Sequence, residues 1–442
     1  SFSGVGIQFI ILDDTIRVVE VIAGGPSEKA GLMPGDRIIT IDDSTTVGKD
    51  IDNNFVMKHL RGDKGSTVKL GIARSTAKKP LTFTVTRGDV PVETVNAYYM
   101  LDNSTGYVKI DQFGRNTYNE FLSALMALHV DGASRFVIDL RGNGGGYMEM
   151  AIMMANEFLP DNTLIVSTRG RYKRDNSEWW SDGYGKFRTF EVAVLIDEFS
   201  ASASEIFAGA MQDNDRGLIV GCRSFGKGLV QHQLTLPDSS AIRLTIARYY
   251  TPSGRCIQKD YKHSDYDNEL LTRYQNGELY SADSIKINKD RQFLTAHGRL
   301  VYGGGGIIPD IFVPRDTTGL SAYYIEVFNA GLLQQYAFHY YEAHRERIAR
   351  MDNYKQFLRT LPPDDVLLNN FVEFAQTHGV PPRWYYINQS RSLLLTYIKA
   401  LVARNAFGNS AFYPIINRND KTVQTALKAM SKHKAAFPII AK

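Results

Sequence analysis

Two short stretches of the chain carry the residue types that hydrolytic chemistry needs. The first alternates serine with alanine after an apolar run and contains Ser200, Ser202 and Ser204. The second holds Lys227 between two glycines. A serine hydroxyl becomes a useful nucleophile when a neighbouring base takes its proton. A lysine can be that base once desolvation lowers its pKa from about 10.4 toward about 7–8. The two stretches supply the residue types that a serine hydrolase with a lysine base would need.

Spacing alone leaves the choice among the three serines open. Ser200 belongs to the end of an expected strand, and Ser204 is well placed as the N-cap of an expected helix, with Glu205 in the first turn. Ser202 falls at the turn itself, where N–H groups of the beginning helix would face a developing oxyanion. In a purely structural alternative, all three serines serve turns and caps, and Lys227 is an ordinary surface lysine.

The elements that must position these residues alternate between strand and helix from about residue 90 to 314. Apolar strand patterns cover 105–110, 135–140, 164–168, 192–196, 218–220, 229–236 and 242–250, and helical patterns cover 118–128, 148–159 and 204–211. Buried strands that alternate with helices are typical of an α/β fold. Residues 258–299 are polar and tyrosine-rich, which predicts a long surface excursion.

The two ends of the chain have different patterns. The first 88 residues predict a small β-rich domain with strands over 6–12, 16–22, 37–41, 67–73 and 81–86 and a helix over 53–60. After about residue 317, helical spacing covers 323–341, 367–377, 390–405 and 422–433. We therefore predict a mixed α/β multidomain protein with an N-terminal domain (1–88), an α/β core (89–316) and a C-terminal helical region (317–442).

Composition excludes several classes of protein. The net charge of +4 is small for 442 residues and the basic residues are scattered, so no nucleic-acid surface is predicted. No run approaches the ~18 apolar residues of a membrane span. The first residues, SFSGVG, lack the features of a signal peptide, and we expect a mature or trimmed chain. Cys222 and Cys256 could form a disulfide or remain free thiols.

Residues 24–43, GGPSEKAGLMPGDRIITIDD, closely resemble the PDZ family in the arrangement that bacterial proteases carry. In that resemblance the loop Gly4, Val5, Gly6 and Ile7 binds the terminal carboxylate of a peptide. Successive N–H groups in a glycine-containing loop form such an anion site. The resemblance also implies that the helix over 53–60 lines the peptide groove, with Val56 and Leu60 among its apolar residues.

The segments SASASEIFAGAMQD and SFGKGLVQ resemble the carboxyl-terminal processing proteases, also called tail-specific proteases. The resemblance implies that Ser202 is the nucleophile and that Lys227, 227 − 202 = 25 residues later, is the general base. Gln231 matches a glutamine that assists the dyad, and Asp213 matches an aspartate that supports the site.

The segment DLRGNGGG, residues 139–146, resembles the glycine turn of the same family. It implies an oxyanion site made by an N–H near Gly145 or Gly146 together with the N–H of Ala203. Arg87, at the exit of the PDZ-like segment, is a candidate hinge that would couple peptide binding to the dyad; the alternative is an ordinary surface arginine.

The resemblance implies a PDZ domain joined to a crotonase-like core that cleaves proteins near their carboxyl terminus without a metal or cofactor. The expected partners are proteins or peptides with free carboxyl termini. Assembly of copies through the helical tail and a regulatory partner protein are further expectations. The resemblance further implies an exported enzyme of the bacterial periplasm or cell envelope.

Other functions fit the residues less well. Residues 221–227 match seven positions of a phosphate-binding loop, but Gly228 stands where magnesium binding needs serine or threonine. His232 with Asp213 or Asp197 could complete a Ser-His-Asp triad, although His232 would face away from Gln231 on a strand. No HExxH is present, which disfavours a zinc protease. A catalytically silent PDZ scaffold is the main rival, and a crotonase-like acyl-CoA enzyme is another.

Overall fold

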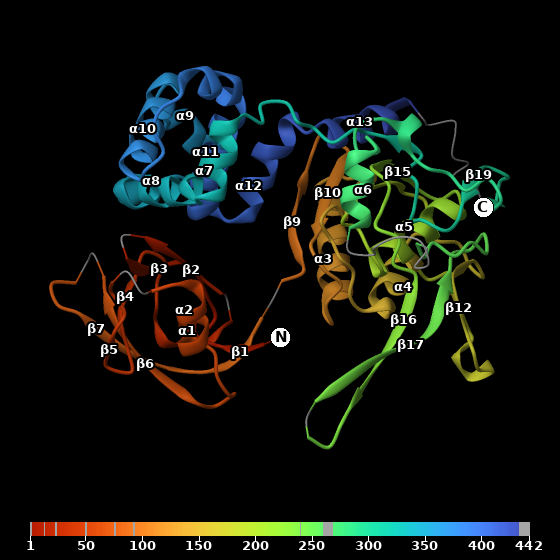
Figure 1. The fold of residues 1–442 in the computed structure, drawn as a ribbon, viewed down its shortest axis with the longest axis horizontal. Helices are drawn as coiled ribbons and strands as arrows, with labels where there is room; N and C mark the ends of the chain where they lie inside the picture. Colours follow the sequence, from red (N-terminus) through yellow and green to blue (C-terminus); the bar gives the residue numbers. More distant parts are fainter. Residues whose placement is uncertain are drawn as a thin grey trace. The chain divides into compact units, whose positions relative to one another are not determined.

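The computed structural model describes residues 2–12, 14–22, 24–48, 51–74, 77–91, 93–238, 240–259 and 268–432. The chain forms two compact units (Figure 1), Ser1–Val92 with Thr318–Ile416 and Glu93–Thr317 with Asn417–Lys442. The second unit contains the serine and lysine stretches. None of the helices in the described ranges is long and apolar enough to cross a membrane.

A six-stranded sheet forms the centre of the second unit, in the order β20-β15-β14-β11-β10-β9. Five neighbouring strands run parallel and β9 is antiparallel to β10. The strands are β9 (Val95–Met100), β10 (Thr105–Ile110), β11 (Arg135–Asp139), β14 (Glu191–Ile196), β15 (Leu218–Gly221) and β20 (Ile311–Phe312). The predicted α/β core is confirmed, and the register places the carboxyl ends of β11, β14 and β15 side by side.

Helices cover both faces of this sheet. On β14, Val192, Val194 and Ile196 belong to the core that also contains residues of α3 (Thr117–Val130), α4 (Met148–Asn156) and α5 (Ala203–Asp213). The alternate residues Ala193 and Leu195 are equally buried but lie outside that core. Since successive side chains of a strand point to opposite faces, they face the other side, where α13 (Lys421–Lys432) contacts β14 and β15.

A second sheet of the same unit has the order β13-β12-β17-β16. Its strands are β12 (Leu164–Gly170), β13 (Ser177–Trp180), β16 (Leu229–Thr235) and β17 (Ala241–Tyr250). The predicted excursion over 258–299, of which 260–267 lie outside the described residues, contains α6 (Glu269–Gln275) and β18 (Gln292–Leu294), which pairs with β19 (Leu300–Tyr302).

The N-terminal part of the first unit is the predicted β-rich domain. Its strands are β1 (Phe2–Gly4), β2 (Ile7–Leu12), β3 (Thr15–Val21), β4 (Arg37–Ile41), β5 (Ser44–Thr45), β6 (Thr67–Ala73), β7 (Leu81–Thr86) and β8 (Gly88–Val90). The main sheet has the order β2-β3-β4-β6-β7. The helices are α1 (Pro26–Ala30) and α2 (Asn53–Leu60). Pro26 begins α1 and Gly31 follows it with φ of 90°.

The helical part of the first unit has its own apolar core. Its helices are α7 (Ala322–Asn329), α8 (Leu332–Ile348), α9 (Tyr354–Thr360), α10 (Asp364–Thr377), α11 (Trp384–Phe407) and α12 (Asn409–Ile416). The helix predicted over 323–341 is divided at Gly331, which has a φ of 68°. The last predicted helix, over 422–433, differs from our assignment: α13 packs on the α/β core and belongs to the second unit, and position 433 lies outside the described residues.

Candidate active site

The three serines that spacing alone could not separate have different surroundings. The hydroxyls of Ser200 and Ser204 are fully buried and donate hydrogen bonds of 2.9 Å to the carbonyl oxygens of Leu140 and Asn143, respectively. Ser202 is only partly buried, and its hydroxyl donates to no acceptor in the described part of the chain. Ser202 is thus the serine of this turn whose proton is available for transfer.

The backbone at Ser202 has an unusual conformation, with φ of 57° and ψ of −114°. A positive φ is uncommon for a residue with a side chain, and such strain concentrates at functional turns. Ser202 is also the N-cap of α5, which begins at Ala203. Our expectation that Ser204 caps this helix was wrong, because the chain enters the helix two residues earlier and Ser204 instead bonds to the neighbouring loop.

The loop that carries Lys227 is tied to the serine turn through the backbone. The Tyr249 hydroxyl donates to the carbonyl oxygen of Lys227 and, at 3.1 Å, to that of Ser202. Glu205 accepts the N–H of Lys227 at 2.8 Å and the N–H of Ser202 at 2.9 Å. Two side chains therefore each contact both residues of the predicted dyad. The structure thus brings the backbones of Ser202 and Lys227 close together although 25 residues separate them in the sequence, and in the described part of the chain no hydrogen bond joins their side chains.

Glu205 has a larger role than the first-turn acid that we predicted. Its side chain is fully buried, and its carboxylate also accepts the N–H of Gly226 at 2.7 Å and the hydroxyl of Ser224 at 2.5 Å. Burial raises the pKa of Glu205 in spite of these hydrogen bonds. The signal in the sequence was the S-x-x-E spacing of a capping box, Ser202 to Glu205, which we did not use.

The glycine turn lies against the serine turn. A Cβ atom on Gly145 would lie 2.6 Å from the carbonyl oxygen of Ala201 and 2.7 Å from Cβ of Ser202, and the φ of Gly145 is 98°. Both the space and the backbone conformation require glycine at this position. The resemblance predicted that these two turns meet, and the structure places them in contact.

Two backbone N–H groups beside Ser202 are free to bind an oxyanion. The Gly145 N–H is already bonded to Oδ1 of Asn143 at 2.8 Å. In the described ranges the N–H groups of Gly146 and Ala203 have no acceptor. Ala203 is fully buried, and an unpaired buried N–H is rare unless a ligand completes it. Of the two glycines that we considered, Gly146 is therefore the available donor.

Asp213 and Ser202 lie at opposite ends of α5. Eleven residues of helix separate them by about 16 Å. The buried carboxylate of Asp213 pairs with Arg255 at 2.7 Å and accepts a hydrogen bond of 2.7 Å from the Ser253 hydroxyl. Its contacts thus fix the loop that follows β17, so any support for the dyad is indirect.

Gln231 and His232 lie on β16, opposite Thr245 and Leu244 of β17. Both side chains are exposed, and as neighbours on a strand they point to opposite faces. In the described part of the chain neither residue has a hydrogen bond to Ser202 or Lys227.

The predicted carboxylate-binding loop lies between β1 and β2. The carbonyl oxygens of Val5 and Gly6 accept the N–H groups of Ser27 and Ile22 at 2.8 and 3.0 Å. The N–H groups of Val5 and Gly6 have no acceptor among the described residues, as an anion site requires. Gly4 and Ile7 are the adjoining strand residues.

Two predicted groove residues on α2 belong to the interior of the domain. Val56 and Leu60 are 0% and 4% exposed and form part of the apolar core, so they offer no free surface to a peptide. Their helical neighbours Phe55 and His59 are half-buried, with ring centres 4.1 Å apart.

Arg87 is buried rather than exposed, which excludes the ordinary surface arginine. Its guanidinium donates to the carbonyl oxygens of His59 and Leu60, at 2.8 and 3.0 Å, and to that of Thr67 at 2.9 Å. Arg87 therefore fixes the end of the helix that was predicted to line the groove.

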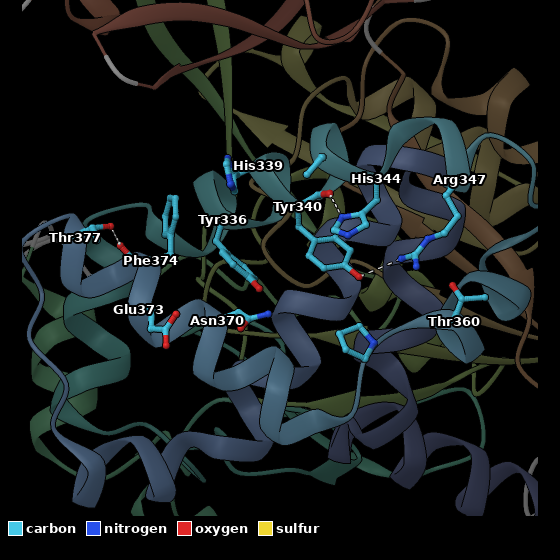
Figure 2. Close-up of a pocket in the computed structure, with 12 residues that line it drawn as sticks. Tyr336, His339, Tyr340, His344, Arg347, Thr360, Asn370, Glu373, Phe374 and Thr377 are labelled. Atoms are coloured by element: carbon cyan, nitrogen blue, oxygen red, sulfur yellow. Dashed lines mark hydrogen bonds between the residues drawn. The ribbon is translucent and has the colours of Figure 1, made fainter.

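A separate cavity of about 620 Å³ lies in the helical part of the first unit, between α8 and α10 (Figure 2). Tyr336, Tyr340 and Arg347 of α8 and Glu373 of α10 are among its lining residues (Figure 2). Its lining contains no serine, cysteine or lysine, so the cavity cannot provide a Ser-Lys site.

The described residues contain no cluster of three or more potential metal ligands. Both cysteines are free. Burial raises the pKa of Cys222 to about 12, which suppresses the thiolate that nucleophilic chemistry needs.

Comparison with known proteins identifies three segments. Residues 104–267 match the model of peptidase family S41, residues 3–90 match the PDZ domain, and residues 323–408 match a family of unknown function, DUF8443. The first two matches cover the parts of the chain where the PDZ-like segment, the serine turn and the lysine loop lie.

Curated relatives agree with these matches. The carboxy-terminal processing protease CtpB of Bacillus subtilis is 38% identical over 301 residues, which are 66% of this chain and 60% of the relative. The carboxyl-terminal-processing protease of Synechocystis is 36% identical over 265 residues, 58% of this chain and 60% of the relative. The chain thus spans about 60% of the length of these two relatives.

A solved structure, a photosystem II D1 C-terminal processing protease, is 31% identical, with 58% of this chain and 69% of that chain covered and a TM-score of 0.35. On these sequence matches, the chain belongs to the carboxyl-terminal processing proteases, the PDZ-containing serine peptidases of family S41.

Proposed function

We propose that this chain is a serine endopeptidase that uses a Ser202–Lys227 dyad to cleave protein substrates near their carboxyl terminus. The observation that carries the proposal is the shared anchoring of the two residues. Tyr249 and Glu205 each bond to the backbone of both, and Ser202 is the serine of its turn with a free proton.

The reaction follows from the groups at the serine turn. The Ser202 hydroxyl attacks the carbonyl carbon of the scissile peptide, and neutral Lys227 takes the hydroxyl proton. The oxyanion of the tetrahedral intermediate accepts hydrogen bonds from the N–H groups of Ala203 and Gly146. The C–N bond then breaks, and the lysine returns the proton to the leaving amine. Water attacks the acyl-enzyme ester in the same way and regenerates Ser202.

The PDZ domain provides the reason for cleavage near the carboxyl terminus. The free N–H groups of Val5 and Gly6 suit a terminal carboxylate, and the glycine-containing loop that carries them is held by its carbonyls. When the PDZ loop binds the carboxyl terminus of an extended substrate, a segment upstream of that terminus can reach the dyad. Gln231, four residues after Lys227, is proposed to assist the lysine.

The test is cleavage of an unfolded protein with an apolar carboxyl terminus. The wild type is compared with Ser202→Ala, Lys227→Ala and, as a matched control, Lys186→Ala at an exposed lysine of the same unit. We expect activity in the wild type and the control only, with all four proteins folded. Activity retained by Lys227→Ala would refute the lysine base and favour His232. Turnover by none of them would favour the catalytically silent PDZ scaffold.

A further inference from the structure

The chain returns to the catalytic unit after the helical region, in a segment that lies beyond all three matched families. This segment contains residues 417–420 and α13. Val423, Ala426 and Met430 of α13 are buried at helical spacing. They cover the face of the central sheet opposite α3, α4 and α5.

Asp420, directly before α13, makes two kinds of contact with one carboxylate. Oδ1 accepts the N–H groups of Thr422 and Val423 at 2.9 Å each and so caps the helix. Oδ2 accepts a hydrogen bond of 2.8 Å from Nη1 of Arg141. Arg141 also donates from Nη2 and Nε to Asp139 at 2.6 and 3.0 Å. The guanidinium is therefore held between two carboxylates, one of them from the end of the chain.

The segment reaches the same ion pair by a second route. Asn417 donates to the Tyr99 hydroxyl at 2.9 Å, and the ring of Tyr99 lies 5.1 Å from that of Tyr107. The Tyr107 hydroxyl donates to Asp139 at 2.7 Å. Asp420 thus contacts the Asp139–Arg141 pair directly, and Asn417 is linked to it through Tyr99 and Tyr107.

Arg141 begins the glycine turn that lies against Ser202. The next residue, Gly142, donates its N–H at 2.9 Å to Asp197, which also accepts the N–H of Ser200 at 3.1 Å. The carbonyl oxygen of Arg141 accepts Nζ of Lys109 at 2.5 Å. The position of Arg141 therefore determines where the turn starts and, five residues on, where the N–H of Gly146 points.

We propose that Asp420 is a positioning residue of the hydrolytic site, which holds the oxyanion turn through Arg141. Through Asp420, the segment that carries α13 contributes to catalysis. The proposal rests on the proposed function. Oxyanion donors act on the transition state more than on the bound substrate, so a displaced turn lowers kcat with little change in KM. Loss of the Asp420 charge should lower kcat roughly tenfold to a hundredfold.

Matched substitutions separate this role from that of a helix cap. Asp420→Asn keeps a good N-cap and removes the charge that pairs with Arg141, whereas Asp420→Ala removes both. Asp420→Glu restores the charge. Lys421→Ala is the control, because Lys421 pairs with Asp316 outside the turn.

Two measurements on the whole chain decide the proposal. For cleavage of the unfolded protein, Asp420→Asn should lower kcat at nearly constant KM and Tm, Asp420→Glu should recover part of kcat, and Lys421→Ala should match the wild type. In hydrogen–deuterium exchange, Asp420→Asn should exchange faster in a peptide that covers residues 140–147. Wild-type exchange and kcat in Asp420→Asn, with a lowered Tm in Asp420→Ala, would reduce Asp420 to a helix cap and overturn the proposal.

The exchange measurement does not depend on turnover. Unchanged protection of residues 140–147 in Asp420→Asn would refute the positioning role whether or not the protein cleaves. Faster exchange in a protein without Ser202-dependent cleavage would instead locate the failure in the proposed function.

Discussion

Replacing Glu205 by glutamine tests the claim that one buried carboxylate joins the two halves of the dyad. The carboxylate accepts four hydrogen bonds, two on each oxygen. In Glu205→Gln one oxygen becomes an NH₂ group. The Ser224 hydroxyl can reverse its bond and accept from this group, but at least one backbone N–H, that of Gly226, then faces a donor. An unsatisfied buried donor costs about 1–3 kcal/mol.

Burial raises the pKa of Glu205, so its charge carries a desolvation cost that glutamine removes. The net loss of stability should therefore lie in the lower half of that range, about 1–2 kcal/mol. For a unit of this size this is a fall in Tm of roughly 2–8 °C. Because the carboxylate no longer holds the N–H of Gly226, directly before Lys227, kcat should fall as well, by about tenfold or more.

The assay combines thermal unfolding with cleavage of the unfolded protein. Glu149→Gln is the matched control, since Glu149 is also a first-turn acid, on α4, but is exposed. We expect the control to keep both Tm and kcat. A Glu205→Gln protein that behaves like the control would refute the view that this carboxylate holds the site together.

Further predictions concern the glycine turn, the buried ion pair and the PDZ domain. Gly145→Ala should abolish detectable cleavage and cost roughly 2–4 kcal/mol in urea unfolding, whereas Gly144→Ala, where a Cβ meets open space, should behave like the wild type. Burial alone would raise the pKa of Asp139, but the charges of Arg141 and Lys109 outweigh it and lower the pKa to about 2. Because folding lowers this pKa, ionised Asp139 stabilises the folded protein by about 2 kcal/mol above pH 4, and this stabilisation is lost as the pH falls through 2. The urea midpoint of Asp139→Asn should lack the corresponding decrease at low pH. Arg87→Ala should lower cleavage without abolishing binding of a carboxyl-terminal peptide, measured by calorimetry; loss of both, or of neither, would end its role as a hinge.

Local patterns predicted most elements of the fold because those elements bury one face or, as in the strand over 105–110, both faces. The strands over 37–41, 67–73, 81–86 and 105–110 and the helix over 53–60 begin and end where the patterns placed them. Residue types with fixed backbone preferences also mark helix ends, since Pro26 begins α1 and Gly31 ends it. These features depend on residues close together in the sequence.

Contacts between distant residues were not predicted. Nothing in the periodicity of α13 distinguishes a helix of the C-terminal region from one that packs on the α/β core, because only the partner surface differs. The helix that contains Val56 was predicted correctly, but which of its faces lines the groove was not. In the structure Val56 lies on the face that packs into the core. The role of Asn143 was not predicted either, because it depends on contacts made in the folded chain. Its side chain accepts the N–H of Gly145 and donates to the carbonyl oxygen of Ile110.

The most direct test of the dyad is covalent labelling with a small fluorophosphonate, followed by peptide mapping. Ser202 should carry the adduct, while Ser200 and Ser204, whose hydroxyls are buried and bonded, stay unmodified. Labelling should be slower by orders of magnitude in Lys227→Ala and unchanged in Lys186→Ala. An adduct on another serine, or equal labelling of Ser202 in Lys227→Ala, would contradict the Ser202–Lys227 mechanism.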